Sequence, residues 1–430
     1  MDDLPDTRLQ EAITYHKRFL AWVGLLLFLL KLGSRRQLDY DLRDLDTQVL
    51  ANLNRLAGTR QETLPVHDTL DHFIGHVGAP PFADLRTKMV RRLIRMKALD
   101  HARLMGRFVV VPDGTGHLVF HRRHCPHCLT QKHRSGTLYL HQVLEAKLVS
   151  PAGLAISIGT EFIENPDEGV GDSAEARKQD CELVAFERLA RSLKRQFPQT
   201  PLCLSGDSLF ACGRGIRIAR QNDWAFIYTF KPSHLPALWA DFQGLLTLSP
   251  GNHLALTLPD GTRQVYRWVS DLIHTDSHGR THRVNALECE ETKAHQTTTF
   301  AWITDLPVNR DTVVALASQG GRPRWTIENQ GFNMQKNSGL NLEHAYSTDP
   351  ERLKAYYYLL QIAHLILQLL ERGSLLIRLA RACGQTPLQL FGSLKNLARR
   401  VLVAFRFHHL PDKAYEIAAA AAIQIRLDTS

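Results

Sequence analysis

The spacing of apolar residues predicts helices at both ends of this chain and strands between them. From residue 1 to about 105, apolar positions recur at helical spacing, as in the leucine stripe between Leu38 and Leu56. Residues 19–30 are an unbroken apolar run of twelve, flanked by basic residues. A membrane span needs roughly 20 residues. We therefore predict a buried helix at this run and no association with a membrane.

Residues 106–231 change to the pattern of an α/β fold. Strands are expected at 107–113, 137–149 and 154–163, with a short return strand at 118–120. An amphipathic helix at 173–197, a strand at 201–207, a helix at 209–220 and a strand at 225–230 follow. Asp113 and Asp207 each stand where an apolar strand is expected to end. The order of three strands, helix, strand, helix and strand is that of an RNase H-like core, in which the first and fourth strands are neighbours.

The remaining pattern predicts an insertion and a helical end. Residues 232–310 alternate like strands at 254–258, 264–268, 284–288 and 297–302, so we expect an all-β insertion. Residues 311–430 are expected to be mostly helical, with one helix starting at Pro323. The predicted regions are therefore a helical DNA-binding or multimerisation region (1–105), the first part of the core (106–231), the β insertion (232–310), and the helix of Glu328 with the C-terminal helices (311–430).

Charge adds a candidate partner to this picture. The chain has 430 residues, 22% of them charged and 44% hydrophobic, as in soluble globular proteins, and a net charge of +9. Basic residues gather at 86–107 and at 372–410. Such runs suit contacts with the phosphates of double-stranded DNA. The candidate DNA-binding residues in the first run are Arg91, Arg92 and Arg95.

Three carboxylates are the candidate chemistry. Asp113 and Asp207 at neighbouring strand ends, with Glu328 on a helix, provide the oxygen ligands of a two-Mg²⁺ phosphoryl-transfer site. Arg324 lies one helical turn before Glu328, where it could form a surface ion pair or contact a phosphate. Trp325 is expected to lie in the core rather than to stack on a base.

These residues resemble a known family. The segments Asp113-Gly-Thr, Leu-Ser-Gly-Asp207-Ser and Arg324-Trp-x-Ile-Glu328, with a lysine at 336, look like the DDE transposases of bacterial insertion sequences. The most similar branch has a Tyr-x-x-Arg-x-x-x-Glu-x6-Lys signature and a β insertion before the glutamate. The resemblance covers roughly residues 107–345. It implies an RNase H-like catalytic domain, and it implies Mg²⁺-dependent cleavage at element ends with transfer of the 3′-hydroxyl into target DNA.

The resemblance also implies residue roles and a setting. Asp113, Asp207 and Glu328 would bind metal, and Arg324 and Lys336 would contact DNA phosphates near the cut. The protein would act as a homodimer or multimer on element-end and target DNA. Its expected location is the bacterial cytoplasm, associated with the nucleoid.

The chain departs from the signature at two positions. The tyrosine position is occupied by Gly321, and the lysine is one residue late, at Lys336. On an ideal helix this places Lys336 about 80° away from Glu328. A one-residue insertion is often absorbed as a π-bulge, and such bulges favour functional sites. We therefore predict a bulge near 329–332, around Gly331, that returns Lys336 to the face of Glu328.

The cysteines suggest a second metal. The chain has seven, an odd number placed mostly in apolar segments, which is typical of a reducing compartment. Cys125 and Cys128 form a C-x-x-C motif among several histidines. The pattern fits a structural Zn²⁺ site, but no second pair stands at standard spacing, so a reduced hairpin remains the alternative.

Two other functions share the same core. One is a DNA-binding protein that descends from a transposase and no longer cuts, which the complete set of three carboxylates disfavours. The other is an RNase H-like nuclease that cuts branched DNA without needing element ends. The β insertion and the basic helical regions favour the transposase.

Overall fold

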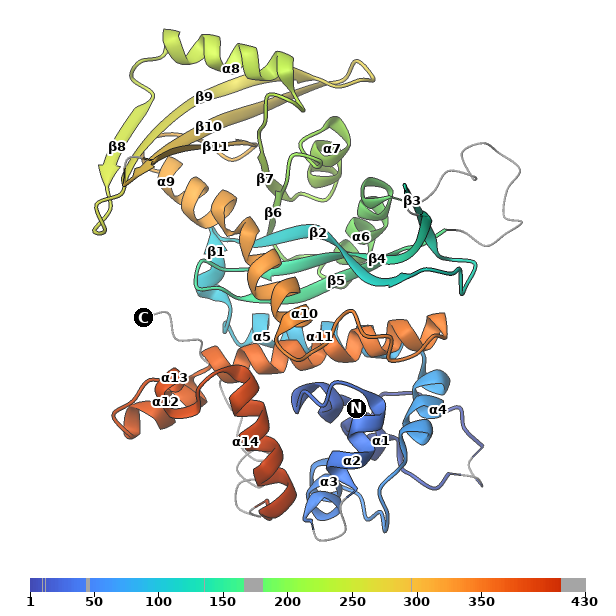
Figure 1. Cartoon of the computed structure of the whole chain (residues 1–430). Helices are drawn as coiled ribbons and strands as arrows, with labels where there is room; N and C mark the ends of the chain where they lie inside the picture. Colours follow the sequence, from blue (N-terminus) through green and yellow to red (C-terminus); the bar gives the residue numbers. More distant parts are fainter. Residues whose placement is uncertain are drawn as a thin grey trace. The chain divides into compact units, whose positions relative to one another are not determined.

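The computed structural model describes residues 1–9, 11, 13–43, 47–134, 136–165, 181–294 and 296–410, in two compact units (Figure 1). The first unit contains residues 1–99, 116–140 and 332–430, and the second contains residues 100–115 and 141–331. The unit boundaries fall inside the strands β2 (Arg107–Phe120) and β4 (Gly136–Val149) and the helical turn η5 (Ile327–Asn333).

The first unit is mainly helical. Its helices are α1 (Lys17–Leu29), α2 (Arg35–Leu42), α3 (Val49–Ala57), α4 (His67–Val77), α5 (Pro80–Arg95), α10 (Met334–Asn337), α11 (Pro350–Arg372), α12 (Ser374–Ala382), α13 (Pro387–Phe391) and α14 (Leu394–Phe407). The long α11 packs against α1, α4 and α5. The apolar run at 19–30 forms α1 and is buried, as predicted. Among the described residues, no helix is long and apolar enough to cross a membrane.

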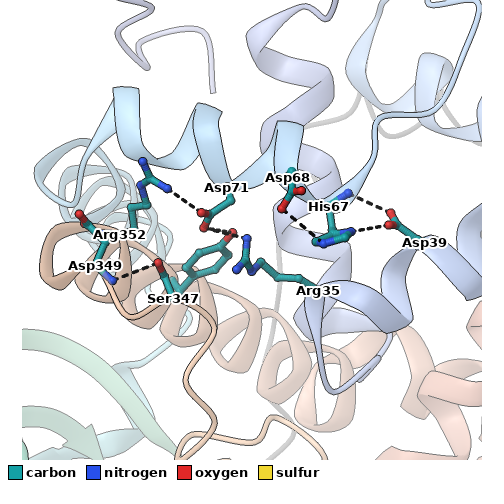
Figure 2. A network of polar contacts seen from close by, with 9 residues as sticks. Arg35, Asp39, His67, Asp68, Asp71, Ser347, Asp349 and Arg352 are labelled. Atoms are coloured by element: carbon teal, nitrogen blue, oxygen red, sulfur yellow. Dashed lines mark hydrogen bonds and ion pairs between the residues drawn. The ribbon is translucent and has the colours of Figure 1, made fainter. Parts of the chain in front are cut away.

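A polar network ties three helices of this unit together (Figure 2). Asp71 on α4 is 8% exposed and pairs with Arg35 of α2 at 3.1 Å and with Arg352 of α11 at 2.7 Å. The Tyr356 hydroxyl of α11 donates to the same carboxylate at 3.2 Å. Because the carboxylate of Asp71 bonds to side chains of two other helices, it holds the three helices together. Its loss would leave two guanidinium groups without a compensating charge.

We expect Asp71→Ala to destabilise the protein by about 2–4 kcal/mol, since removing one partner of a buried pair strands the others. Asp68→Ala is the matched control on the same helix. Its side chain is 73% exposed, so we expect a change within about 0.5 kcal/mol. Urea unfolding of both variants measures the difference. Equal losses of stability would show that the network does not hold the helices.

The second unit is built on a mixed sheet. The remaining strands are β1 (Arg103–Leu104), β3 (Leu129–His133, in the first unit), β5 (Ala155–Ile163), β6 (Leu202–Gly206), β7 (Ala225–Thr229), β8 (His253–Thr257), β9 (Arg263–Thr275), β10 (Thr281–Lys293) and β11 (Gln296–Thr304). The eleven strands follow the order β3-β4-β2-β6-β7-β11-β10-β9-β8, with β1 on β2 and β5 on β4. The helices of this unit are α6 (Glu182–Gln196), α7 (Gly213–Gln221), α8 (Pro236–Leu248) and α9 (Val313–Ala315), besides the short η2 (Asp100–Ala102).

The neighbouring position of the first and fourth core strands is confirmed. Strands β2 and β6 are parallel and pair up to Val110↔Leu204, and β6 pairs in parallel with β7. Asp113 and Asp207 each lie three residues beyond that last pair (113 − 110 = 3 and 207 − 204 = 3). Parallel strands with equal offsets bring the two aspartates to one end of the sheet.

Several expectations about the elements are wrong. Asp113 does not end its strand, because β2 continues as one strand through both glycines to Phe120. The insertion is not all-β: α8 precedes its four strands and packs against β9. The insertion also extends the core sheet, since β11 pairs with β7. The amphipathic helix begins at Glu182, and residues 173–180 of the expected helix lie outside the described residues, as does the end of the chain from residue 411.

The helical run that carries Glu328 starts ten residues earlier than predicted, at Val313 rather than Pro323. It passes through α9, the π-helical η3 (Leu316–Gly321), the 3₁₀ turn η4 (Arg322–Arg324) and the π-helical η5 before α10. Proline removes one backbone donor, and Pro323 is accommodated here where the hydrogen-bond pattern changes from π to 3₁₀. The bulge predicted near 329–332 is confirmed by η5.

Candidate active site

Four carboxylates of the second unit come from four different elements. Asp113 lies on β2, Asp207 directly follows β6, Glu182 opens α6, and Glu328 lies in η5. We call these four residues the acidic cluster. The sequence predicted Asp113, Asp207 and Glu328 as partners, and in the fold the charges of Asp207 and Glu328 both act on Asp113.

The electrostatics of Asp113 show this proximity. Burial raises the pKa of Asp113 to about 7, and the Arg324 guanidinium opposes the rise. The negative charges of Glu328, Glu182 and Asp207 raise it further. Such mutual repulsion is what a bound cation would relieve. A carboxyl with a strongly raised pKa in a group of like charges is a typical feature of a functional site.

Glu182 was missed by the sequence reasoning. Its carboxylate fills the space that a Cβ would need at Gly114, next to Asp113. Burial raises the pKa of Glu182, and the charge of Asp207 adds to the effect. The sequence offered little signal, because Glu182 was placed inside a helix expected to begin at Ser173, where an acid is unremarkable. The glycine after Asp113 was the one available hint of a close approach.

Arg324 and Trp325 flank the cluster with charge and an aromatic surface. The Arg324 guanidinium donates to Glu328 at 2.9 Å and lies 4.3 Å from the Trp325 ring centre. Trp325 is 53% exposed, so its expected place in the core is wrong. A pocket of the second unit has basic and aromatic walls, to which Lys231, Phe300, Trp302, Arg322, Arg324 and Trp325 contribute. Cationic and aromatic side chains of this kind suit a phosphate and a base.

Gly321, at the signature's tyrosine position, lies flat against Trp302. A Cβ at residue 321 would overlap the indole ring, so the site has no room for any side chain there. The departure from the family signature therefore has a structural cause: Trp302 occupies the space.

We expect Gly321→Ala to destabilise the protein by about 1–3 kcal/mol, because overpacking forces the indole or the helix to move. Gly244→Ala on α8 is the matched control. No atom lies within 4 Å of its added Cβ, and alanine at an open helical position stabilises by up to about 1 kcal/mol. Thermal unfolding of both variants tests this, and a neutral Gly321→Ala would show that the fit is not tight.

Gly331 has a packing role of its own. An added Cβ would lie 3.1 Å from Cδ of Lys147, a fully buried lysine that pairs with the equally buried Glu145 at 3.5 Å. The glycine therefore lets the widened turn lie on this buried ion pair.

Lys336 belongs to the first unit and pairs with Glu343 at 2.7 Å. Its predicted return to the face of Glu328 and its contact with DNA stay predictions.

The basic run at 86–107 is helical only in its first part, since α5 ends at Arg95 and Lys97 adopts a positive φ. Arg91, Arg92 and Arg95 are exposed. Arg86 is 1% exposed and lies over the ring of Tyr358, so it packs in the first unit instead of facing solvent. The exposed arginines fit the predicted DNA contacts but do not test them.

A His/Cys cluster is the other candidate metal site. It consists of His124, Cys125, Cys128 and His141, whose ligand atoms all lie within 4.8 Å of one another. Within the described ranges, this is the one group of three or more His, Cys, Asp or Glu side chains set closely enough to hold an ion. The carboxylate oxygens of the acidic cluster therefore do not lie as close together as the ligand atoms of the His/Cys cluster. Their like charges repel one another, and Glu328 is paired with Arg324.

A comparison of the chain with protein-family models gives no match, and a comparison with curated proteins gives none either. The assignment of function therefore rests on the geometry of the acidic cluster and its surroundings.

Proposed function

We propose that the protein is a DDE-type transposase that cleaves DNA at the ends of a mobile element and transfers the 3′-hydroxyl into target DNA. The observation that carries this proposal is the acidic cluster. Its two aspartates each lie three residues beyond the last residue pair of two adjacent parallel strands, and its glutamate lies on a helix beside an arginine. The strand order β5-β4-β2-β6-β7, with β2–β6 and β6–β7 parallel, supports an RNase H-like core.

The donor set fits Mg²⁺, which prefers carboxylate oxygens with water and phosphate completing its shell. Asp113, Asp207 and Glu328 would hold the metal once their carboxylates, which this structure does not bring as close together as the ligand atoms of the His/Cys cluster, closed around it. When bound there, Mg²⁺ would supply activation of the attacking oxygen and stabilisation of the leaving 3′ oxygen. The negative charges of Glu328, Glu182 and Asp207, which add to the effect of burial in raising the pKa of Asp113, support this fit because a cation would compensate them.

The residues around the cluster supply binding and orientation. Arg324 is 12% exposed in its side chain and faces both Glu328 and the basic aromatic pocket, so it can exchange its glutamate partner for a phosphate. Exposed Trp325 offers a stacking surface, and such contacts contribute about 1–3 kcal/mol per base. A second hollow, which Ser208 lines directly after Asp207 in the chain, also has Arg214, Arg217 and His234 in its walls and offers further cationic groups for phosphates.

The proposal is tested with the full chain and a plasmid that carries its coding sequence with the native flanking DNA. We expect Mg²⁺-dependent strand breaks at the element ends and joined products in a second plasmid, and both are mapped by sequencing. EDTA should abolish both products. Cleavage of branched DNA without any preference for element ends would favour the nuclease, and binding without cleavage would favour a non-cutting descendant.

A further inference from the structure

We propose that His124, Cys125, Cys128 and His141 form a structural Zn²⁺ site. The residues lie at the start of the β3–β4 hairpin and are distinct from the acidic cluster. This inference does not depend on the proposed function.

The spacing of the ligand atoms matches a tetrahedral ion. Zinc–sulfur bonds of about 2.3 Å put two thiolates at the vertices of a tetrahedron about 3.8 Å apart. The Sγ atoms of Cys125 and Cys128 are 3.4 Å apart, and Nδ1 of His124 lies 3.7 Å from Sγ of Cys128. Both separations are close to a tetrahedral edge. The sulfur separation is far longer than a disulfide bond, and neither cysteine forms a disulfide.

Backbone groups hold the turn of the C-x-x-C motif in place. The backbone N–H groups of His127 and Cys128 donate to Sγ of Cys125. Outer-shell hydrogen bonds of this kind orient metal ligands. Arg123 donates to the carbonyl oxygens of Cys125 at 3.3 Å and Pro126 at 2.9 Å, which closes the turn around the C-x-x-C motif.

The fourth ligand belongs to the same hairpin. His124, Cys125 and Cys128 precede β3 within the first unit, and Leu129 of β3 pairs with Leu140 of β4. His141 is the next residue of β4 after Leu140, and its ligand atom lies within 4.8 Å of those of the other three residues. Cys128 is 1% exposed and His141 is 4% exposed. Buried sulfur and imidazole in a set of two cysteines and two histidines is the composition of a closed structural zinc site.

The metal content of the purified full chain tests this site. After expression with zinc in the medium and purification without chelators, mass spectrometry of dissolved metals should give one zinc per chain. Replacing the wild-type zinc by Co²⁺ should give a sulfur-to-cobalt charge-transfer band and strong visible bands of a tetrahedral ion. No bound metal, a metal other than zinc, or the weak spectrum of an octahedral ion would overturn the proposal.

Variants identify the ligands. Cys125→Ser and His141→Ala should each lower zinc affinity by more than the roughly 10–100-fold loss caused by removing an outer-shell partner. Cys383→Ser and His133→Ala are matched controls at exposed positions and should keep one zinc per chain. If a ligand variant does not fold, the cobalt spectrum of the wild type still decides. Zinc retained at full affinity in Cys125→Ser would contradict the site.

Discussion

Replacing Asp113 or Glu328 by alanine is expected to lower DNA cleavage at least about 1000-fold while DNA binding is retained. Each carboxylate is proposed to hold Mg²⁺. Removing even one hydrogen-bond donor that stabilises charge in a transition state lowers the rate roughly 10²–10³-fold, and the loss of a metal ligand should cost more. Binding should persist because it depends on cationic surfaces elsewhere, such as the exposed arginines of α5.

The cleavage assay and a gel-shift assay on the same preparations separate the two effects. Asp271→Asn is a suitable control, because Asp271 is 67% exposed and pairs with Arg283 on the surface of the second unit. Its cleavage rate should equal that of the wild type. If Asp113→Ala cut DNA at the wild-type rate, the acidic cluster would not be the active site.

The second large effect concerns the stability of the metal-free protein at different pH values. The pKa of Asp113 is raised from 3.8 to about 7, chiefly by burial. The contribution of protonated Asp113 to the free energy of unfolding is therefore fully present below pH about 4. It is lost as the pH rises through about 7 and the carboxyl group ionises. Asp113→Asn keeps a neutral side chain at every pH. In EDTA it should exceed the wild type in stability by roughly 1–3 kcal/mol at pH 8 and match it at pH 4.

Thermal unfolding of both proteins between pH 4 and pH 8 measures this difference. Mg²⁺ at pH 8 should stabilise the wild type and leave Asp113→Asn nearly unchanged, because the ion compensates a charge that only the aspartate carries. Parallel pH profiles of the two proteins would show that Asp113 is not buried among like charges.

The sequence predicted those features that follow from short-range patterns. Apolar runs gave the core strands, and their order predicted that the strands of Asp113 and Asp207 pair side by side. The one-residue shift before Lys336 predicted the π-helical turn, since an extra residue in a helix has few other solutions. These inferences needed only periodicity and chain order.

Other features depended on tertiary contacts that no local pattern carries. Glu182 joins the cluster because Gly114 has no side chain, and Gly321 replaces the signature tyrosine because Trp302 fills the space. Trp325 is exposed even though Arg324 lies over one face of its ring. The ligand atom of His141 lies close to those of the C-x-x-C motif, although His141 stands well beyond the motif in the sequence.

The most direct test of the central claim is the position of Mn²⁺ in crystals of the full chain. Mn²⁺ takes the place of Mg²⁺ at oxygen ligands and is located by its anomalous scattering. We predict that Mn²⁺ is bound by carboxylate oxygens of Asp113, Asp207 and Glu328. Crystals grown in Mn²⁺ whose acidic cluster holds no ion, with ions bound only at other sites, would contradict the assignment.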